Sequence, residues 1–364
     1  LLSSTQSQMH SITVDRLGGN IDDVVGFSTS TPKPSLRPDD GRIILRTLAV
    51  SIAPGDVRVL SGKTDYMQAP KSLPYIPGGD CCGEVVQVHP GEKKFKVGDM
   101  VMAIFEDGAP RNALAQFVAV KASNAAPKPP NITPEEASAL PSSAMTAMLA
   151  AEQYISEGSR VLILGGSGGV GSHLVQAAKT IGHAGFVAAT STQAEMLKKL
   201  GADRVIDYRC ENWWEVKELH EQGGLDVIID LWGGLEAWER AQCPSSPLKR
   251  TGKYMSTIGD VQYPEVHGIW DALGLVCHIM GRKVSNALSQ WQPRYGLLQG
   301  VYEDSEIMHR LSQRVANGEI TPVLDPASPF EFSADGVKAA LKLQESRHAH
   351  GKVVVRVAAA QPLE

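Results

Sequence analysis

The sequence predicts an α/β protein in which a β-rich domain is followed by a doubly wound parallel sheet. Short β-type segments separated by Pro and Gly fill residues 8–130. A glycine-rich turn at 165–171 then follows an apolar strand, and strands alternate with helical patterns beyond it. The chain has 364 residues, which is enough for two domains of ordinary size.

The β-rich part ends in a proline cluster at 127–130. Thr133 and Pro134 then supply an N-cap and a first-turn proline for a helix that we expect to run to Tyr154. We therefore place a domain boundary near residue 128. Before this boundary, apolar runs bounded by turn residues predict strands at 42–46, 83–88, 99–104 and 116–120.

The part after Arg160 has the pattern of a parallel sheet. Residues 161–164 form a continuous apolar strand, and Val170, Leu174 and Ala178 recur at helical spacing. Apolar strands joined by helical crossovers are typical of a doubly wound sheet. Further short strands are expected at 184–189, 204–207, 225–230 and 253–258.

Residues 266–290 carry an apolar stripe at helical spacing. We interpret this segment as a helix packed in the core, and a lid or dimer element is the alternative. The stripe consists of Ile269, Leu273, Val276, Met280 and Val284. Beyond it we expect a strand at 295–298, a helix at 305–315, and β structure at 320–323 and 351–355 that returns to the first domain.

Charge and composition exclude several classes of partner. The 35 Lys and Arg against 40 Asp and Glu give a net charge of -5, so there is no basic excess to neutralise a phosphate backbone. The 5 cysteines include no C-x-x-C spacing, which fits a reducing compartment. No run approaches the roughly 18 apolar residues that a membrane span needs. We expect a cytoplasmic protein, or one in an organelle matrix or stroma if a targeting segment was trimmed.

The glycine-rich turn predicts a dinucleotide site. It reads Gly165-Gly166-Ser167-Gly168-Gly169-Val170-Gly171 between an apolar strand and an amphipathic helix. A pyrophosphate needs a tight turn, close backbone approach and unpaired amides at a helix N-terminus, and these glycines provide all three. No Gly-Lys-Ser/Thr follows, which excludes a phosphate-loop NTPase.

The residues at the end of the second expected strand of the parallel sheet favour NADP(H) over NAD(H) as the cofactor. An NAD enzyme places an acid there to accept from the ribose 2′-hydroxyl, whereas this chain has Thr190 and Ser191 and no acid before Glu195. Hydroxyls can donate to a 2′-phosphate, and Lys198 and Tyr208 can come near it. The alternative is that Ser191 and Thr192 cap the next helix and Lys198 is a solvated surface charge.

Several motifs in series resemble the medium-chain dehydrogenase/reductase superfamily, and most of all its zinc-free quinone oxidoreductase and enone reductase branch. Besides the glycine turn, they are residues 77–83, 96–99, 140–147, 200–208 and 350–354. The resemblance implies a GroES-like substrate domain, residues 1–127 with 322–364, and a Rossmann NADP(H)-binding domain, residues 128–321. It also implies a cofactor and substrate cleft between the domains, and a homodimer.

The metal ligands of the zinc branch are missing from this sequence. Where zinc alcohol dehydrogenases carry Cys-His ahead of Asp, the chain has Ala53-Pro54-Gly55-Asp56. Where they carry Gly-His-Glu, it has Gly78-Gly79-Asp80, and a lobe with four closely spaced Cys is absent. We therefore predict no metal site and interpret Asp56 as a structural acceptor.

Candidates for the remaining roles come from the resemblance. Tyr66 follows a Ser-Gly turn where this branch often has an aromatic side chain in the substrate cleft, and its phenol is the candidate hydrogen-bond donor. A packing tyrosine is the alternative. Thr146 is similar to the family position that reaches the cofactor, and Lys352 to one that approaches the cofactor phosphates.

The resulting hypothesis is a zinc-independent oxidoreductase that transfers hydride from NADPH to a quinone or an α,β-unsaturated carbonyl. An enoyl-thioester reductase of related fold is the alternative among enzymes. A non-catalytic cofactor-binding structural or interaction protein is the alternative from another class, because the sequence contains no obvious proton donor.

Overall fold

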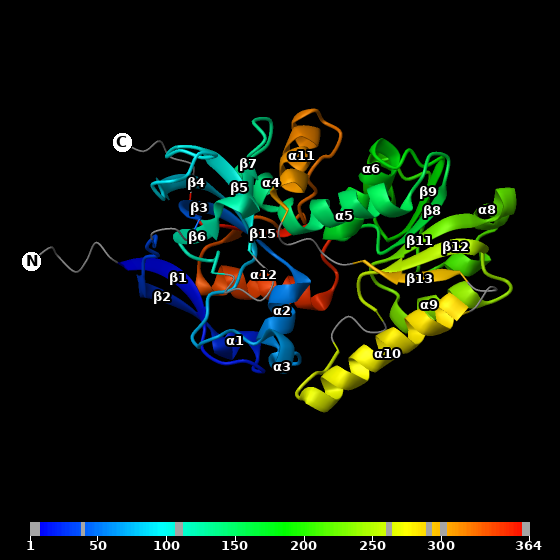
Figure 1. Cartoon of the computed structure of the whole chain (residues 1–364), viewed down its shortest axis with the longest axis horizontal. Coiled ribbons are helices and arrows are strands. Elements are labelled where there is room, and N and C mark those ends of the chain that lie inside the picture. The colour runs from blue at the N-terminus through cyan, green and yellow to red at the C-terminus, as the bar shows by residue number, and fades with distance from the viewer. Residues whose placement is uncertain are drawn as a thin grey trace, which may run out of the picture. The chain divides into compact units, whose positions relative to one another are not determined.

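A computed structural model describes residues 8–37, 41–105, 112–259, 264–288, 293–298 and 304–358 (Figure 1). The chain forms two compact units. The first unit comprises Leu1–Met145, Val301–Gly318 and Pro322–Glu364, and the second comprises Thr146–Gly300 and Glu319–Thr321. The predicted fold class is confirmed, because the first unit is built on a mainly antiparallel sheet and the second on a parallel one. The domain boundaries at 127/128 and 321/322 stay a prediction.

The first unit is built on a seven-stranded sheet with the order β14-β15-β3-β4-β5-β7, in which β6 also pairs with β3. Its C-terminal strand β15 pairs antiparallel with β3, so the end of the chain completes this sheet as expected. The strands are β3 (Arg42–Ile52), β4 (Asp80–Val88), β5 (Met100–Ile104), β6 (Phe117–Lys121), β7 (Ala125–Pro127), β14 (Phe330–Glu331) and β15 (Val353–Arg356). A separate hairpin pairs β1 (Gln8–Val14) with β2 (Val25–Pro32).

The helix expected to run from Thr133 to Tyr154 is divided into two. Thr133 begins the first with a capping box, in which its hydroxyl accepts from the Glu136 amide at 3.2 Å. Pro141 begins the second, because proline has no amide to donate within a continuous helix. The helices of this unit are α1 (Ile21–Val24), α2 (Pro54–Leu60), α3 (Asp65–Gln68), α4 (Pro134–Ser138), α11 (Ser305–Ala316) and α12 (Ala334–Ser346), while α5 (Pro141–Tyr154) runs from the first unit into the second.

The β structure expected at 320–323 is absent from this described stretch of the chain. Only Leu324 pairs, in an isolated parallel bridge with Lys352. Pro322 explains the difference, because a proline cannot donate to a strand ladder. The prediction of a strand there was wrong, whereas the helix at 305–315 is confirmed as α11.

The second unit is built on a six-stranded parallel sheet with the order β10-β9-β8-β11-β12-β13. The strand order reverses between β8 and β11, which is the mark of a doubly wound sheet. The strands are β8 (Arg160–Leu164), β9 (Phe186–Thr190), β10 (Arg204–Ile206), β11 (Leu225–Asp230), β12 (Leu248–Ser256) and β13 (Arg294–Leu297). The strand expected at 295–298 is present as β13, and both of its ends lie one residue earlier than expected.

Helices bury both faces of this sheet. Val161 and Ile163 of β8 share one cluster with Leu174 of α6, whereas Leu162 and Leu164 share another with Trp238 of α9. A strand that is covered on both sides needs apolar residues at every position, which explains the continuous apolar run. The helices are α6 (Gly169–Thr180), α7 (Ala194–Lys199), α8 (Lys217–His220), α9 (Gly234–Gln242) and α10 (Ile269–Leu288).

The helix α10 is present, but its apolar stripe does not pack in the core. The helix contacts the edge strand β13, and the stripe residues are exposed. The exposed fractions are 54% for Ile269, 45% for Leu273, 55% for Val276, 52% for Met280 and 52% for Val284. The interpretation as a core-packed helix was therefore wrong, because helical spacing identifies an apolar face but not what covers it. Within the described ranges, no helix is long and apolar enough to cross a membrane.

Candidate functional site

The glycine turn lies at the carboxyl end of β8, in the second unit. Gly165 has a φ of 85°, a conformation that side chains strongly disfavour. Its amide donates to the Thr190 hydroxyl at 2.9 Å, and the Gly166 amide donates to the Thr190 carbonyl at 3.0 Å. The end of β9 therefore fixes the turn in place.

Close packing explains why the turn needs glycine. A Cβ on Gly171 would lie 2.3 Å from the Gly165 carbonyl oxygen, and one on Gly166 would lie 2.7 Å from the Ala189 Cβ. At Gly168 an added Cβ would meet only one atom, at 3.7 Å. The turn is thus packed tightly against α6 and β9 but open at Gly168.

The N-terminus of α6 fits a dinucleotide pyrophosphate. Its N-cap is Gly168, which has no side chain to cap the helix. The first-turn amides of Gly169, Val170 and Gly171 have no acceptor within the helix, as at every helix start. An open turn with donor amides at a positively polarised helix end binds phosphate well.

The end of β9 carries hydroxyls that already have local partners. Ser191 is 2% exposed, and its hydroxyl accepts from the Gln193 amide at 2.9 Å. The contact forms a turn just before α7, whose N-cap is Gln193 and not Ser191. Lys198 is exposed and lies 4.0 Å from Glu195, and Tyr208 is 56% exposed. Among the described residues, no hydrogen bond joins Lys198 or Tyr208 to the end of β9.

The carboxyl end of β11 holds a buried carboxylate that the sequence reasoning missed. Asp230 is 0% exposed and accepts from the amides of Trp232, Gly233 and Gly234 at 2.9, 2.5 and 2.9 Å. The Tyr254 hydroxyl donates to it at 2.8 Å. Burial raises the pKa of Asp230, and these donors counteract part of that increase. The sequence signal that could have identified Asp230 is an aspartate at the end of an apolar strand, followed three residues later by two glycines.

Burial also raises the pKa of Tyr254, and the charge of Asp230 raises it further. The Tyr254 hydroxyl therefore keeps its proton and serves as a donor. Together, Asp230 and Tyr254 fix the loop after β11 at the same sheet edge that carries the glycine turn.

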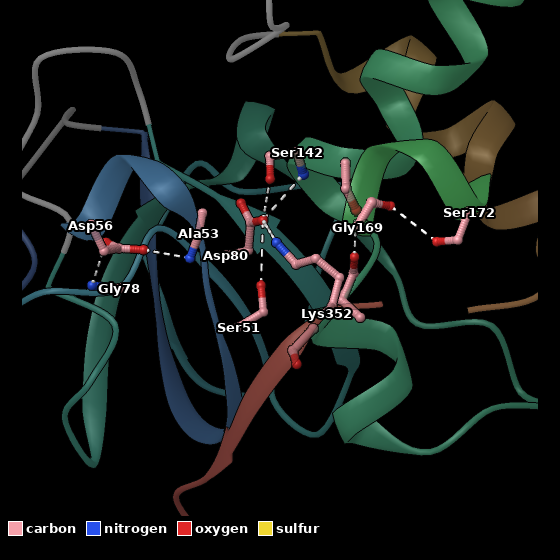
Figure 2. Close-up of polar contacts among 12 residues, drawn as sticks. Ser51, Ala53, Asp56, Gly78, Asp80, Ser142, Gly169, Ser172 and Lys352 are labelled. Atoms are coloured by element: carbon pink, nitrogen blue, oxygen red, sulfur yellow. Dashed lines mark hydrogen bonds and ion pairs between the residues drawn. The ribbon is translucent and has the colours of Figure 1, made fainter. Parts of the chain in front are cut away.

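A second buried polar cluster lies in the first unit (Figure 2). The Lys352 ammonium lies 3.4 Å from Asp80 Oδ2, and these two residues are 5% and 3% exposed. The same oxygen accepts from the Ser142 amide at 3.4 Å and from the Ser51 hydroxyl at 3.5 Å, and the Ser142 hydroxyl also contacts it. Lys352, which we expected to approach the cofactor phosphates, is thus paired with a carboxylate within its own unit.

Asp56 has the structural role that we expected. It is 1% exposed and accepts from the Ala53 amide at 2.9 Å and the Gly78 amide at 3.1 Å (Figure 2). It joins the start of α2 to the turn before β4. The part of the chain that the structure describes contains no group of three or more His, Cys, Asp or Glu that could hold a metal ion.

The candidates Tyr66 and Thr146 differ in exposure. Tyr66 lies on α3 and is 53% exposed, so it is not a packing tyrosine of the core. No hydrogen bond is found for its hydroxyl among the described residues. Thr146 lies on α5 and is 7% exposed.

Of the predicted cofactor residues, the structure brings together Thr190, Ser191 and the glycine turn at one sheet edge.

The buried pair in the first unit gives a testable stability prediction. Asp80→Ala should lower the free energy of unfolding by about 3–5 kcal/mol, because it leaves Lys352 buried without a carboxylate. Lys352→Met should cost less, because Asp80 keeps the donors of Ser51 and Ser142. Urea unfolding measures both, and the double variant should recover much of the loss.

The exposed pair Lys342–Asp22, 2.6 Å apart, is the matched control. Lys342→Met should cost less than about 1 kcal/mol, because solvent screens an exposed pair. Equal losses at the buried and exposed pairs would contradict this account of the Asp80 cluster.

Comparisons with known proteins agree with this architecture. A family model described as "Alcohol dehydrogenase GroES-like domain" matches residues 39–130, and one described as "Zinc-binding dehydrogenase" matches residues 200–355. The 2-methylene-furan-3-one reductase of Solanum lycopersicum is 31% identical over 92% of this chain and 76% of its own.

Two further similarities cover most of the chain. The chloroplastic NADPH-dependent alkenal/one oxidoreductase of Arabidopsis thaliana is 30% identical over 92% of this chain and 76% of its own. The structure of the quinone oxidoreductase from Coxiella burnetii is 25% identical, with a TM-score of 0.75 over 96% of this chain and 100% of that one. With its GroES-like domain, parallel sheet and glycine turn, this chain belongs to the medium-chain dehydrogenase/reductase superfamily.

Proposed function

We propose that the protein is an NADP(H)-dependent oxidoreductase that transfers hydride to a quinone or an α,β-unsaturated carbonyl. The observation that carries the proposal is the open glycine turn at the N-terminus of α6, on the sheet edge where the strand order reverses. Relatives named as an NADPH-dependent alkenal/one oxidoreductase and a quinone oxidoreductase support the substrate class.

The cofactor would be held by the backbone of the turn, and when bound it supplies the hydride. Amides at its open end would donate to the pyrophosphate, and Thr190 would act through the turn that it fixes. Thr146 and Lys352 are candidates for cofactor contact by the family resemblance alone, and the Lys352 ammonium is paired with Asp80 in its own unit. The turn residues in this role are Gly166, Ser167, Gly168, Gly169, Val170 and Gly171.

The chain's own part in the reaction is to orient the reactants and stabilise developing charge. Reduction of a conjugated carbonyl places negative charge on its oxygen, and a hydrogen-bond donor stabilises that charge. The exposed phenol of Tyr66 is the candidate donor. A quinone needs little acid catalysis, so proximity would account for much of the acceleration.

The direct test follows NADPH oxidation with ortho-quinones, para-quinones, enones and enoyl thioesters. We expect turnover with at least one quinone or enone. Turnover with thioesters alone would favour the alternative reductase. Tight cofactor binding without turnover across the panel would favour a non-catalytic cofactor-binding protein.

The end of β9 predicts a preference for NADPH over NADH of about tenfold to a hundredfold, from one or two charge-assisted hydrogen bonds to the 2′-phosphate. Ser191→Asp should erase or invert this ratio, because it puts a carboxylate beside that phosphate. Asp can still accept from the Gln193 amide, so the local turn is kept. Ser191→Asn, which adds no charge, is the control in steady-state kinetics. Equal efficiency with both cofactors in the unmodified protein would contradict the idea.

We also propose that activity needs no zinc. Ala53 and Gly79 stand where the zinc branch supplies Cys and His, and neither has a metal-binding side chain. Prolonged chelator treatment should leave the rate of NADPH oxidation unchanged. Elemental analysis that finds one zinc per chain, rising and falling with activity, would overturn this proposal.

The exposed stripe of α10 supports a homodimer. Its five apolar side chains are each about half exposed, and a specific interface between two copies would bury them. The stripe contains no charged residue, so it can pair with itself across a two-fold axis.

Val276→Glu should therefore convert the dimer to a monomer, because it buries a charge at the centre of the stripe. His278→Glu, on the polar side of the same helix, is the control. Sedimentation velocity at micromolar concentration distinguishes the two states. A 39.0 kDa species alone in the unmodified protein would count against the dimer.

The cellular compartment of the protein is a proposal with two possible outcomes. We expect a cytoplasmic protein, and the chloroplastic relative from Arabidopsis thaliana supports the organelle alternative. Fractionation of cells that carry a tagged full-length chain separates these possibilities.

A further inference from the structure

We propose that the loop between β4 and β5 docks the protein electrostatically on an anionic lipid surface. The loop comprises residues 89–99 and joins two neighbouring strands of the first unit (Figure 1). The glycine turn lies in the second unit, so lipid docking does not depend on the proposed function. The loop carries exposed lysines on a fixed backbone, together with one exposed apolar side chain.

Three lysines of this loop form a cluster of free positive charge. Lys93, Lys94 and Lys96 are all exposed, and among the described residues their ammonium groups have no ion-pair partner. The whole chain has a net charge of -5, so the lysine cluster has the opposite sign. At physiological ionic strength, charges beyond about 8 Å are largely screened. The lysine cluster, and not the net charge, therefore determines what this loop attracts.

The two acidic residues of the loop bind its own backbone. Glu92, whose side chain is 6% exposed, accepts from the Lys94 amide and lies 3.4 Å from His89 Nε2. Asp99 accepts from the Lys96 amide at 2.9 Å. Both carboxylates thus stabilise the shape of the loop, while the lysine ammonium groups remain in solvent.

The backbone that carries the lysine cluster is fixed. Phe95 is 6% exposed and packs in the core of the first unit, so its neighbours Lys94 and Lys96 are held at the surface. The Gly98 amide donates to the Val85 carbonyl at 2.8 Å, which ties the loop to β4. A fixed loop loses little backbone freedom when it docks.

An anionic lipid surface fits this loop better than an acidic protein does. A specific protein interface buries about 800 Å² on each partner, which is more than one short loop provides. Binding of lysines to anionic lipid needs no such area, because each lysine near the surface strengthens it about fivefold. Val97 follows the lysine cluster and is 55% exposed, so it can enter the boundary between headgroups and acyl chains.

The test is co-sedimentation of the full chain with lipid vesicles. One set of vesicles contains phosphatidylcholine alone, and the other contains phosphatidylcholine with phosphatidylserine. We expect binding to the anionic vesicles to be about a hundredfold stronger, from three lysines at about fivefold each. Added salt should remove most of this difference, because it screens exposed charges.

Variants of the loop separate charge from apolar contact. Lys93→Glu, Lys94→Glu and Lys96→Glu combined should remove the preference for anionic vesicles, and each single variant should weaken it at least about fivefold. Val97→Ser should weaken binding to the anionic vesicles about threefold, because it removes only the apolar contact.

The matched control makes the same change in net charge elsewhere. Lys71→Glu, Lys199→Glu and Lys217→Glu combined alter three exposed lysines outside the loop. This variant should bind the anionic vesicles within about threefold of the unmodified protein, because those charges do not belong to the cluster. Thermal unfolding verifies that each variant is folded, and the single lysine variants keep the test decisive if a triple variant is unstable.

Four outcomes would overturn the proposal. The first two are equal binding to both kinds of vesicle and no binding to either. The third is a loop variant that binds the anionic vesicles as well as the control does, because another surface would then hold the lipid. The fourth is binding to soluble polyglutamate without binding to vesicles, which would favour an acidic protein as the partner.

Discussion

The contact between the start of α6 and the end of β8 is the constraint on which the candidate site depends. Gly171 lies so close to the turn that an added Cβ would come within 2.3 Å of the Gly165 carbonyl oxygen. This approach brings the helix N-terminus to the sheet edge, where its first-turn amides, which have no acceptor within the helix, would donate to a bound phosphate. The hydroxyl of Thr190 and the loop held by Asp230 then fix the two sides of this edge.

Buried charge has a different role in each unit. In the second unit Asp230 is surrounded by amide donors and a protonated tyrosine, so it organises a loop without a cation. In the first unit Asp80 is paired with Lys352 and joins β4, β15 and the start of α5. Buried polar groups of this kind cost free energy unless they are fully paired, and each pair therefore specifies one local arrangement.

Much of the fold follows from local patterns in the sequence. The apolar run at 161–164 and the glycine turn predict β8 and α6 because strand periodicity and turn chemistry are local. The helix break before Pro141 and the missing strand at 320–323 both depend on prolines. These prolines are visible in the sequence, but the spacing of apolar residues alone does not show their effect. The exposure of the α10 stripe could not be predicted, because spacing does not show what covers a face. Asp230 was missed because its position beside the glycine turn depends on the pairing of strands far apart in the chain.

The central proposal is that the glycine turn at the start of α6 holds the cofactor. Amide hydrogen exchange with and without NADPH tests it most directly, because the first-turn amides of α6 have no acceptor within the helix and should exchange quickly in the free protein. We predict that saturating NADPH slows exchange in peptides covering residues 165–172. Saturating NADPH that leaves the turn unprotected while slowing exchange elsewhere in the chain would contradict the account.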